Sequence, residues 1–101
     1  MWYLVMSKTI NRVPLDHPDF RTHLDWLEQA HRDGKVLFSG PSEDRAFGIY
    51  IIVADNLEEA TQIANEDVHH QTGSRKLQII PWDIKYVGKN GTFEGVSTPS
   101  G

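Results

Sequence analysis

One stretch, residues 48–54 (GIYIIVA), constrains the fold more than any other part of the sequence. Its density of β-branched and aromatic residues favours a strand and disfavours a helix. Apolar residues occupy both sets of alternate positions, and alternate side chains of a strand point to opposite faces of the sheet. The sequence therefore predicts a strand that is apolar on both faces of its sheet.

Three further segments have the character of strands: residues 2–7 (WYLVMS), 35–40 (KVLFSG) and 76–87 (KLQIIPWDIKYV). The first is short and rich in aromatic and β-branched residues. The last alternates apolar and polar residues toward its end. Pro81 within it favours an edge strand or a bulge, because proline donates no backbone hydrogen bond. A polar loop, residues 40–48 (GPSEDRAFG), joins the second strand to the third.

Two segments have the periodicity of amphipathic helices. Residues 19–34 (DFRTHLDWLEQAHRDG) follow Pro18, a residue typical of the first helical position, and end on a glycine. Residues 55–70 (DNLEEATQIANEDVHH) begin with Asn56 and a glutamate three residues later, which is the spacing of a capping box. We therefore expect two helices, the second of them continuous from its cap to residue 70.

The resulting order is strand, helix, strand, strand, helix, strand. This order predicts an α+β, ferredoxin-like βαββαβ protomer, in which an antiparallel sheet carries both helices on one face. Residues 1–87 form this single domain, and the Gly-, Ser- and Thr-rich tail, residues 88–101, is expected to be mobile. Because the helices leave an apolar sheet face uncovered, the sequence also predicts a homodimer.

The composition excludes several classes of function. The ten Lys and Arg residues stand against fourteen Asp and Glu, a net charge of -4, so nucleic acid is not an expected partner. The longest uncharged run, residues 46–54, is far shorter than the roughly 20 apolar residues of a membrane span. We therefore expect no membrane partner and a cytoplasmic location. The absence of cysteine excludes disulfides, a thiol nucleophile and a cysteine-ligated metal.

Two ionisable residues lie on the inward faces of the predicted helices. His23 is close to the centre of the apolar stripe of the first helix, and Asp67 falls on the inward side of the second. Since both helices pack on one sheet face, the carboxylate can orient the imidazole or raise its basicity. The alternatives are a half-buried histidine bonded to a carbonyl and a solvated acid in the last helical turn.

Asp44, in the loop of residues 40–48, is a third candidate, because this loop can reach over the sheet edge toward the first helix. The alternative is an ordinary polar hairpin loop. Asp67, His69 and His70 form a cluster with metal-binding side chains. We expect no metal there, because adjacent histidines on a helix point about 100° apart and no fourth ligand is evident.

The order of several short motifs resembles that of the YCII-related (YciI-like) family. The likeness spans residues 1–87 and rests on RTHLDWL (residues 21–27), DGKVLFSGP (residues 33–41), Asp44, NLEEA (residues 56–60), Asp67 and Gly73. The resemblance implies a dimeric α+β barrel built from ferredoxin-like protomers, related in fold to muconolactone isomerase.

The resemblance also implies catalytic residues. The family's histidine falls on His23, and its aspartates fall on Asp44 and Asp67. Many members have proline after the last aspartate, whereas this chain has Val68, a residue that lets the helix run on and changes the direction of the carboxylate.

The family includes a dehydrochlorinase acting on chlorinated hydroxyhydroquinones. The resemblance therefore implies a small enzyme without a cofactor, a lyase or isomerase acting on a small cyclic or aromatic compound, with His23 as the base and Asp44 or Asp67 as its partner. The alternatives are a non-catalytic ligand-binding or assembly module and a cofactorless oxygenase. Four aromatic residues are candidates for lining the substrate pocket, with core packing as the alternative for each: Trp2, Trp26, Phe38 and Tyr50.

Overall fold

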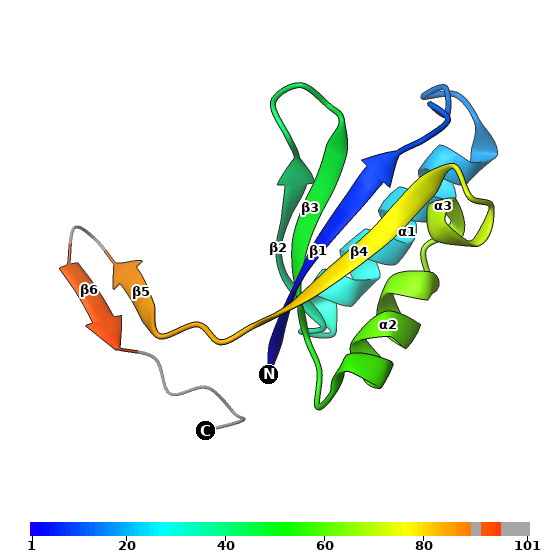
Figure 1. The fold of residues 1–101 in the computed structure, drawn as a ribbon. Helices are drawn as coiled ribbons and strands as arrows, with labels where there is room; N and C mark the ends of the chain where they lie inside the picture. The colour runs from blue at the N-terminus through cyan, green and yellow to red at the C-terminus, as the bar shows by residue number, and fades with distance from the viewer. Residues whose placement is uncertain (90–91, 96–101) are drawn as a thin grey trace.

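The computed structural model describes residues 1–89 and 92–95. It contains a four-stranded antiparallel sheet, helices on one face of that sheet, and a separate two-stranded hairpin (Figure 1). In chain order the elements are β1 (Trp2–Thr9), α1 (Pro18–Arg32), β2 (Val36–Pro41), β3 (Phe47–Val53), α2 (Leu57–Asn65), α3 (Val68–Gln71), β4 (Arg75–Trp82), β5 (Tyr86–Lys89) and β6 (Thr92–Gly95).

The strand order of the main sheet is β2-β3-β1-β4, and every pairing is antiparallel. β1 and β3 are the inner strands, and Figure 1 shows α1, α2 and α3 on the same side of them. This arrangement confirms the ferredoxin-like α+β fold. The edge position of β4 also agrees with the proline at residue 81.

The core lies between the inner strands and the helices. In β1, Tyr3 and Val5 are 2% and 0% exposed, and they pair across the sheet with Ile52 and Tyr50 of β3. Burying a side chain such as that of Ile52 stabilises the fold by roughly 1.5–3 kcal/mol. The buried apolar residues are Tyr3, Val5, Ala30, Val36, Tyr50, Ile52, Ala54, Ala60, Ile63 and Ala64.

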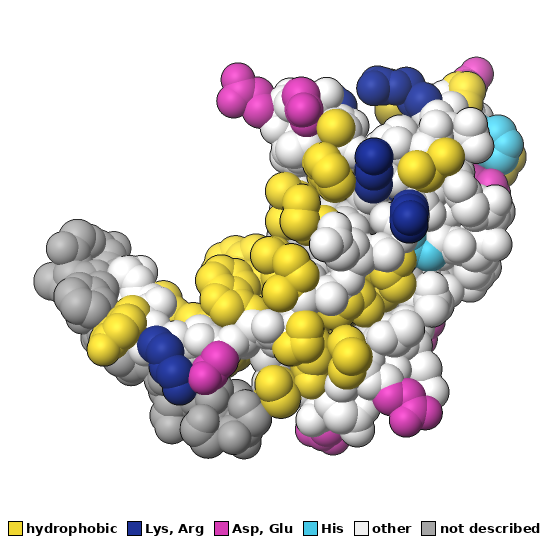
Figure 2. All heavy atoms as spheres, in the orientation of Figure 1, with side chains coloured by type: hydrophobic (Ala, Val, Ile, Leu, Met, Phe, Trp, Pro, Cys, Tyr) yellow, Lys and Arg dark blue, Asp and Glu magenta, His cyan; other side chains and the backbone are white. Residues whose placement is uncertain are grey.

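The opposite face of the sheet, called the helix-free face below, is also apolar. It carries Trp2, Leu4 and Met6 of β1, Ile49, Ile51 and Val53 of β3, and Ile80 and Trp82 of β4. Figure 2 shows these side chains as a yellow area over the strands. Ile80 and Trp82 are 40% and 43% exposed, which is unusual for large apolar residues gathered on one surface. Both faces of β3 are therefore apolar, as the sequence predicts.

The prediction of one continuous second helix is wrong. α2 ends at Asn65, and a separate helix, α3, begins at Val68. Asp67 between them has an extended backbone and acts as the N-cap of α3, accepting a hydrogen bond from the backbone N–H of His69. A short acidic side chain competes for backbone donors in this way, so the helix breaks at Asp67 without a following proline. Within the described chain, no helix has the length and apolar character needed to span a membrane.

The last predicted strand, residues 76–87, is also divided. β4 ends at Trp82, which pairs with Trp2 at the very beginning of β1. After Trp82 the chain leaves the main sheet and forms the β5–β6 hairpin (Figure 1). Part of the expected tail is thus paired in strands. Residues 90–91 and 96–101 lie outside the described residues, and the mobility of the tail stays a prediction.

Candidate active site

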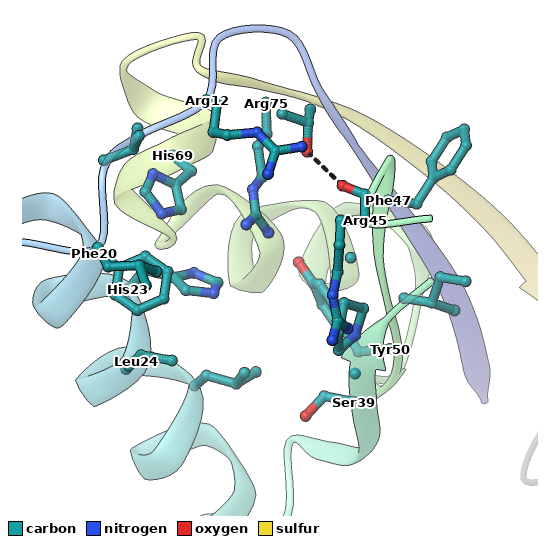
Figure 3. Close-up of a pocket in the computed structure, with 18 of the residues that line it drawn as sticks. Arg12, Phe20, His23, Leu24, Ser39, Arg45, Phe47, Tyr50, His69 and Arg75 are labelled. Atoms are coloured by element: carbon teal, nitrogen blue, oxygen red, sulfur yellow. Dashed lines mark hydrogen bonds between the residues drawn. The ribbon is translucent and has the colours of Figure 1, made fainter. Parts of the chain in front are cut away.

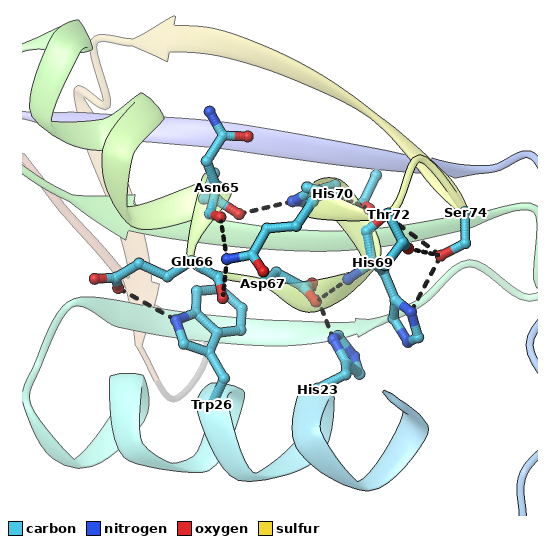
Figure 4. Close-up of polar contacts among 12 residues, drawn as sticks. His23, Trp26, Asn65, Glu66, Asp67, His69, His70, Thr72 and Ser74 are labelled. Atoms are coloured by element: carbon cyan, nitrogen blue, oxygen red, sulfur yellow. Dashed lines mark hydrogen bonds and ion pairs between the residues drawn. The ribbon is translucent and has the colours of Figure 1, made fainter. Parts of the chain in front are cut away.

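His23 and Asp67 form a buried pair between α1 and the beginning of α3. The Nδ1 atom of His23 lies 2.9 Å from Oδ2 of Asp67, and the two residues are 8% and 0% exposed. The apolar stripe of α1 turns the imidazole inward, and the N-cap position of α3 aims the carboxylate at it (Figure 4). The structure therefore brings together the two residues that sequence periodicity places on the inward faces of the helices.

The charge of Asp67 fixes the tautomer of His23. Burial raises the pKa of Asp67, but the hydrogen bond from His23, the histidine charge and the His69 backbone N–H outweigh burial and hold that pKa below its ordinary value. An ionised carboxylate can only accept hydrogen bonds, so Nδ1 of His23 carries the shared proton. The other ring nitrogen, Nε2, is then the basic atom of the imidazole.

Neighbouring rings hold His23 in place. Its ring centroid lies 4.7 Å from that of His69, and 6.5 Å from those of Phe20 and Trp26. Trp26 is itself tied down, because its indole N–H donates to Glu66 at 3.3 Å. These contacts restrict the imidazole to one orientation, which is what positioned acid–base chemistry requires.

His23 forms part of the wall of a cavity of about 690 Å³. The cavity is bounded by α1, by β2 and β3, and by the segment that follows β1 (Figure 3). Leu24 and Leu27 give it an apolar side, while Tyr50 and His69 add polar groups. A cavity of this size, mostly apolar with a few polar groups, suits a small organic molecule.

Tyr50 has an unusual position in this wall. The residue is only 4% exposed, and its hydroxyl has no hydrogen-bond partner within the described part of the chain. Burial raises the pKa of the phenol, so it remains a neutral hydrogen-bond donor. A buried hydroxyl without a partner is destabilising, which makes this group a candidate for contact with a ligand.

Asp44 is not brought to the His23–Asp67 pair. It lies on the exposed turn between β2 and β3, where its Oδ1 accepts hydrogen bonds from the Ser42 hydroxyl at 2.7 Å and the Ala46 N–H at 3.0 Å. The Ala46 N–H, followed by the Ser42 hydroxyl, lowers the pKa of the Asp44 carboxyl. The carboxylate thus shapes a turn in which Arg45 has a positive φ of 64° and lines the cavity.

The four aromatic candidates occupy different places. Tyr50 lines the cavity, and Trp26 packs edge-on behind it with ring centroids 6.0 Å apart. Phe38 is 70% exposed on the edge strand β2. Trp2 lies on the helix-free face opposite Trp82. Of the four candidates, Tyr50 therefore lines the cavity, and Trp26 contacts Tyr50 without lining the cavity itself.

His69 and His70 point in different directions, as neighbours on a helix do. His69 contacts the Ser74 hydroxyl at 3.2 Å, while Nδ1 of His70 donates to the Ala64 carbonyl at 2.7 Å. Nε2 of His70 therefore accepts from the Ser7 hydroxyl, 2.6 Å away. This pair resembles a nucleophile and its base, but Ser7 is 0% exposed and outside the cavity wall, so its role is structural. The described residues include no cluster that could hold a metal ion.

The arginines of the cavity were not among the site residues predicted from the sequence. Arg12, Arg45 and Arg75 come from three segments far apart in the chain, and each lines the cavity (Figure 3). Strand pairing could have indicated Arg75, because antiparallel pairing of the first and last strands of the sheet brings the end of β1 next to the beginning of β4. Thr9 indeed pairs with Arg75.

The chain is similar to known proteins in its sequence and in its fold. The family model "YCII-related domain" matches residues 1–83. The uncharacterized protein YjpA of Bacillus subtilis (strain 168) is 30% identical over 83 residues, which are 82% of this chain and 95% of that protein. Among solved structures, the 5-chloro-2-hydroxyhydroquinone dehydrochlorinase TftG of Burkholderia phenoliruptrix AC1100, in complex with 2,5-dihydroxybenzoquinone, has a TM-score of 0.62 and 19% identity. That match covers 82% of this chain and 94% of TftG.

Proposed function

Because this chain belongs to the YCII-related family, we propose that its His23–Asp67 pair is the acid–base centre of a small enzyme that needs no cofactor. The observation that carries this proposal is the location of the pair: the histidine is buried against an ionised carboxylate and forms part of a cavity wall. Paired, oriented histidines in a concave site are typical of proton-transfer catalysis.

In the proposed reaction, Asp67 keeps the proton on Nδ1 of His23 and stabilises the imidazolium that forms when Nε2 takes a second proton. The substrate is a small cyclic or aromatic compound that loses a proton from a phenolic oxygen or from carbon. In a lyase of the TftG kind, chloride leaves with the electrons of the C–Cl bond, and the net loss is HCl. In an isomerase, the imidazolium returns the proton to another carbon. The dehydrochlorinase activity of TftG, a neighbour of the same fold, favours the lyase.

We also propose that the enzyme is a homodimer formed through the helix-free face. Its strands present neighbouring aliphatic and aromatic side chains, and an exposed apolar patch of this kind is typical of an interface. A second copy of the same chain offers an equally apolar, self-complementary surface, as a twofold interface requires.

The enzymatic proposal is tested with a panel of halogenated hydroquinones, lactones and quinones. Chloride release and exchange of substrate hydrogen with deuterated water are measured, because the second detects proton transfer without net turnover. We expect His23→Asn to reduce the rate by roughly 10²- to 10⁴-fold and to remain folded.

His17→Asn is the matched control. His17 is an exposed N-cap of α1, a position that asparagine also suits, so this variant should keep wild-type activity. Near-normal turnover in His23→Asn contradicts a catalytic imidazole. Binding of 2,5-dihydroxybenzoquinone by the wild type without turnover or exchange on any member of the panel supports a non-catalytic binding module instead.

A further inference from the structure

The cavity wall is positively charged although the chain is acidic. The net charge of the chain is -4, yet the cavity is lined by three arginines and by no aspartate or glutamate. Arg12 follows β1, Arg45 lies in the turn between β2 and β3, and Arg75 begins β4 (Figure 3). Three cations gathered around one concave surface raise the local concentration of small anions.

No acidic side chain of the described residues neutralises these arginines. Among the described residues, none of the three takes part in an ion pair, whereas Arg21 and Arg32 on the outer side of α1 are paired with acidic residues. Arg75 is the most enclosed of the three, being half-buried where the other two are exposed. A guanidinium held in such a position retains its full capacity to bind an oxyanion.

Gly48 gives Arg75 its place. A Cβ atom built on Gly48 would lie 2.9 Å from Nη1 of Arg75, closer than side-chain carbons normally come. The guanidinium therefore occupies the space above β3 that any other residue at position 48 would fill. Tyr50 lies two residues further along the same face of β3, so its hydroxyl and the Arg75 guanidinium reach into the same part of the cavity (Figure 3).

The Tyr50 hydroxyl completes the site. It is buried and has no partner among the described residues, and the charges of Asp67 and then Arg75 both act on it. A guanidinium and a neutral phenol are both donors, and an oxyanion accepts from both. His23 faces the same cavity from α1.

We propose that Arg75 and Tyr50 form an oxyanion-binding subsite, and that the substrate is a small planar organic anion carrying a carboxylate or an ionised enol. The anionic oxygen binds between the two donors and places the ring of the substrate before Nε2 of His23. The proposal rests on the proposed function only in treating this cavity as the substrate site, and it concerns binding alone.

The test is calorimetric binding with two matched pairs of probes. The carboxylate pair is 2,5-dihydroxybenzoate and its neutral amide, 2,5-dihydroxybenzamide. The enol pair is 2,5-dihydroxybenzoquinone, which is ionised at neutral pH, and 2,5-dimethoxybenzoquinone, which is not. We expect at least one anion to bind about 10- to 100-fold more tightly than its neutral partner, the range expected for a hydrogen bond to a charged group. The pair that discriminates identifies the carboxylate or the enol as the preferred group.

Variants then locate the subsite. Arg75→Gln and Tyr50→Phe should each reduce anion affinity about 10-fold or more and leave the affinity for the neutral probe unchanged. Arg32→Gln, an exposed arginine on α1, is the control and should bind like the wild type. If Arg75→Gln does not fold, anion affinity is measured in Gly48→Ala instead. The added methyl group displaces only the flexible end of Arg75, so this variant should also bind the anion more weakly.

Equal affinities for the anions and their neutral partners overturn the proposal. Unchanged anion binding in the folded Arg75 or Gly48 variant overturns it as well, as does the absence of binding of both anions at millimolar concentration. These outcomes are distinct from a failure of the proposed enzyme, because His23→Asn should keep selective anion binding. Selective binding without turnover leaves the subsite in place and removes only the catalytic role.

Discussion

Nδ1 of His23 and Oδ2 of Asp67 are 2.9 Å apart, although 44 residues separate them in the sequence. Each partner is fixed by its own local structure: the imidazole by the stripe of α1, and the carboxylate by the N-cap of α3. Because Asp67 uses its second oxygen to cap α3, one residue supports both the folding of that helix and the orientation of the imidazole.

We expect Asp67→Ala to destabilise the protein more than His23→Asn. The aspartate variant loses a helix cap and leaves the buried imidazole without its partner, which together lower the free energy of unfolding by about 3 kcal/mol or more. The histidine variant loses less, because the asparagine amide can still donate to Asp67. Urea denaturation of both variants measures the difference. Asp44→Ala, an exposed aspartate in a turn, is the control and should have a small effect. Equal losses in the two aspartate variants contradict this account.

Tyr50→Phe should leave the stability of the protein unchanged or raise it. The substitution removes a buried hydroxyl that has no partner among the described residues, so no internal hydrogen bond is lost. Thermal unfolding of this variant is compared with that of Tyr3→Phe, a buried tyrosine on the neighbouring strand whose hydroxyl contacts the Met1 sulfur at 3.5 Å. A loss of more than about 1 kcal/mol in Tyr50→Phe alone indicates a structural partner for its hydroxyl.

The pH dependence of stability should contain a contribution from His69. Burial, followed by the charge of His23, lowers the pKa of His69 below its ordinary value of 6.5. As the pH falls below 6.5, the unfolded chain takes up this proton before the folded protein does. Stability from His69 is therefore complete above pH 6.5 and is lost as the pH falls toward the folded-state pKa.

Asp67 adds a second loss at lower pH. Its pKa is also depressed, so its contribution is complete above its ordinary value of 3.8 and is lost as the pH falls through the folded-state pKa. Unfolding free energies measured from neutral to acidic pH distinguish the two residues. In His69→Gln, the loss that begins near pH 6.5 should become smaller, while the loss below pH 3.8 should remain. Parallel curves for the wild type and His69→Gln contradict the first assignment.

We expect sedimentation to show a dimer of the 11.5 kDa chain at micromolar concentration. Ile51→Lys places a charge at the centre of the helix-free face and should give a monomer, while Gln29→Lys, the same change in charge on the exposed side of α1, should not. A stable wild-type monomer refutes the proposed interface.

A chain ending at Val87 should behave like the full-length chain in sedimentation, because β5 and β6 pair with each other rather than with the main sheet.

Much of the fold follows from local patterns. The β-branched segment that becomes β3, the capping residues of α1 and α2, and the order of strands and helices along the chain all agree with the observed fold. The inward positions of His23 and Asp67 also follow from helical periodicity. The break before α3 is not evident from the sequence, because the helical periodicity of residues 55–70 continues through Asp67. Only the hydrogen bond from the His69 N–H reveals that Asp67 caps a new helix.

The oxyanion donors are harder to predict, because they depend on contacts between distant segments. Arg75 and Tyr50 belong to different strands, and β1 lies between those strands in the sheet. The long Arg75 side chain crosses β1 to reach Gly48, a contact that depends on the missing side chain at that position. Neither composition nor periodicity indicates such a contact. Strand pairing alone predicts the end of the sheet at which Arg75 lies, but it does not predict which residues the Arg75 side chain contacts.

The double use of Asp67 affects how mutation and selection act on this family. Replacing His23 removes the imidazole and leaves α3 capped, whereas replacing Asp67 damages the fold itself. If His23 is the base of the proposed reaction, selection for folding alone would retain the aspartate in a relative that lacks this activity. Under the proposed function, an aspartate at this position is therefore weaker evidence of activity than the histidine.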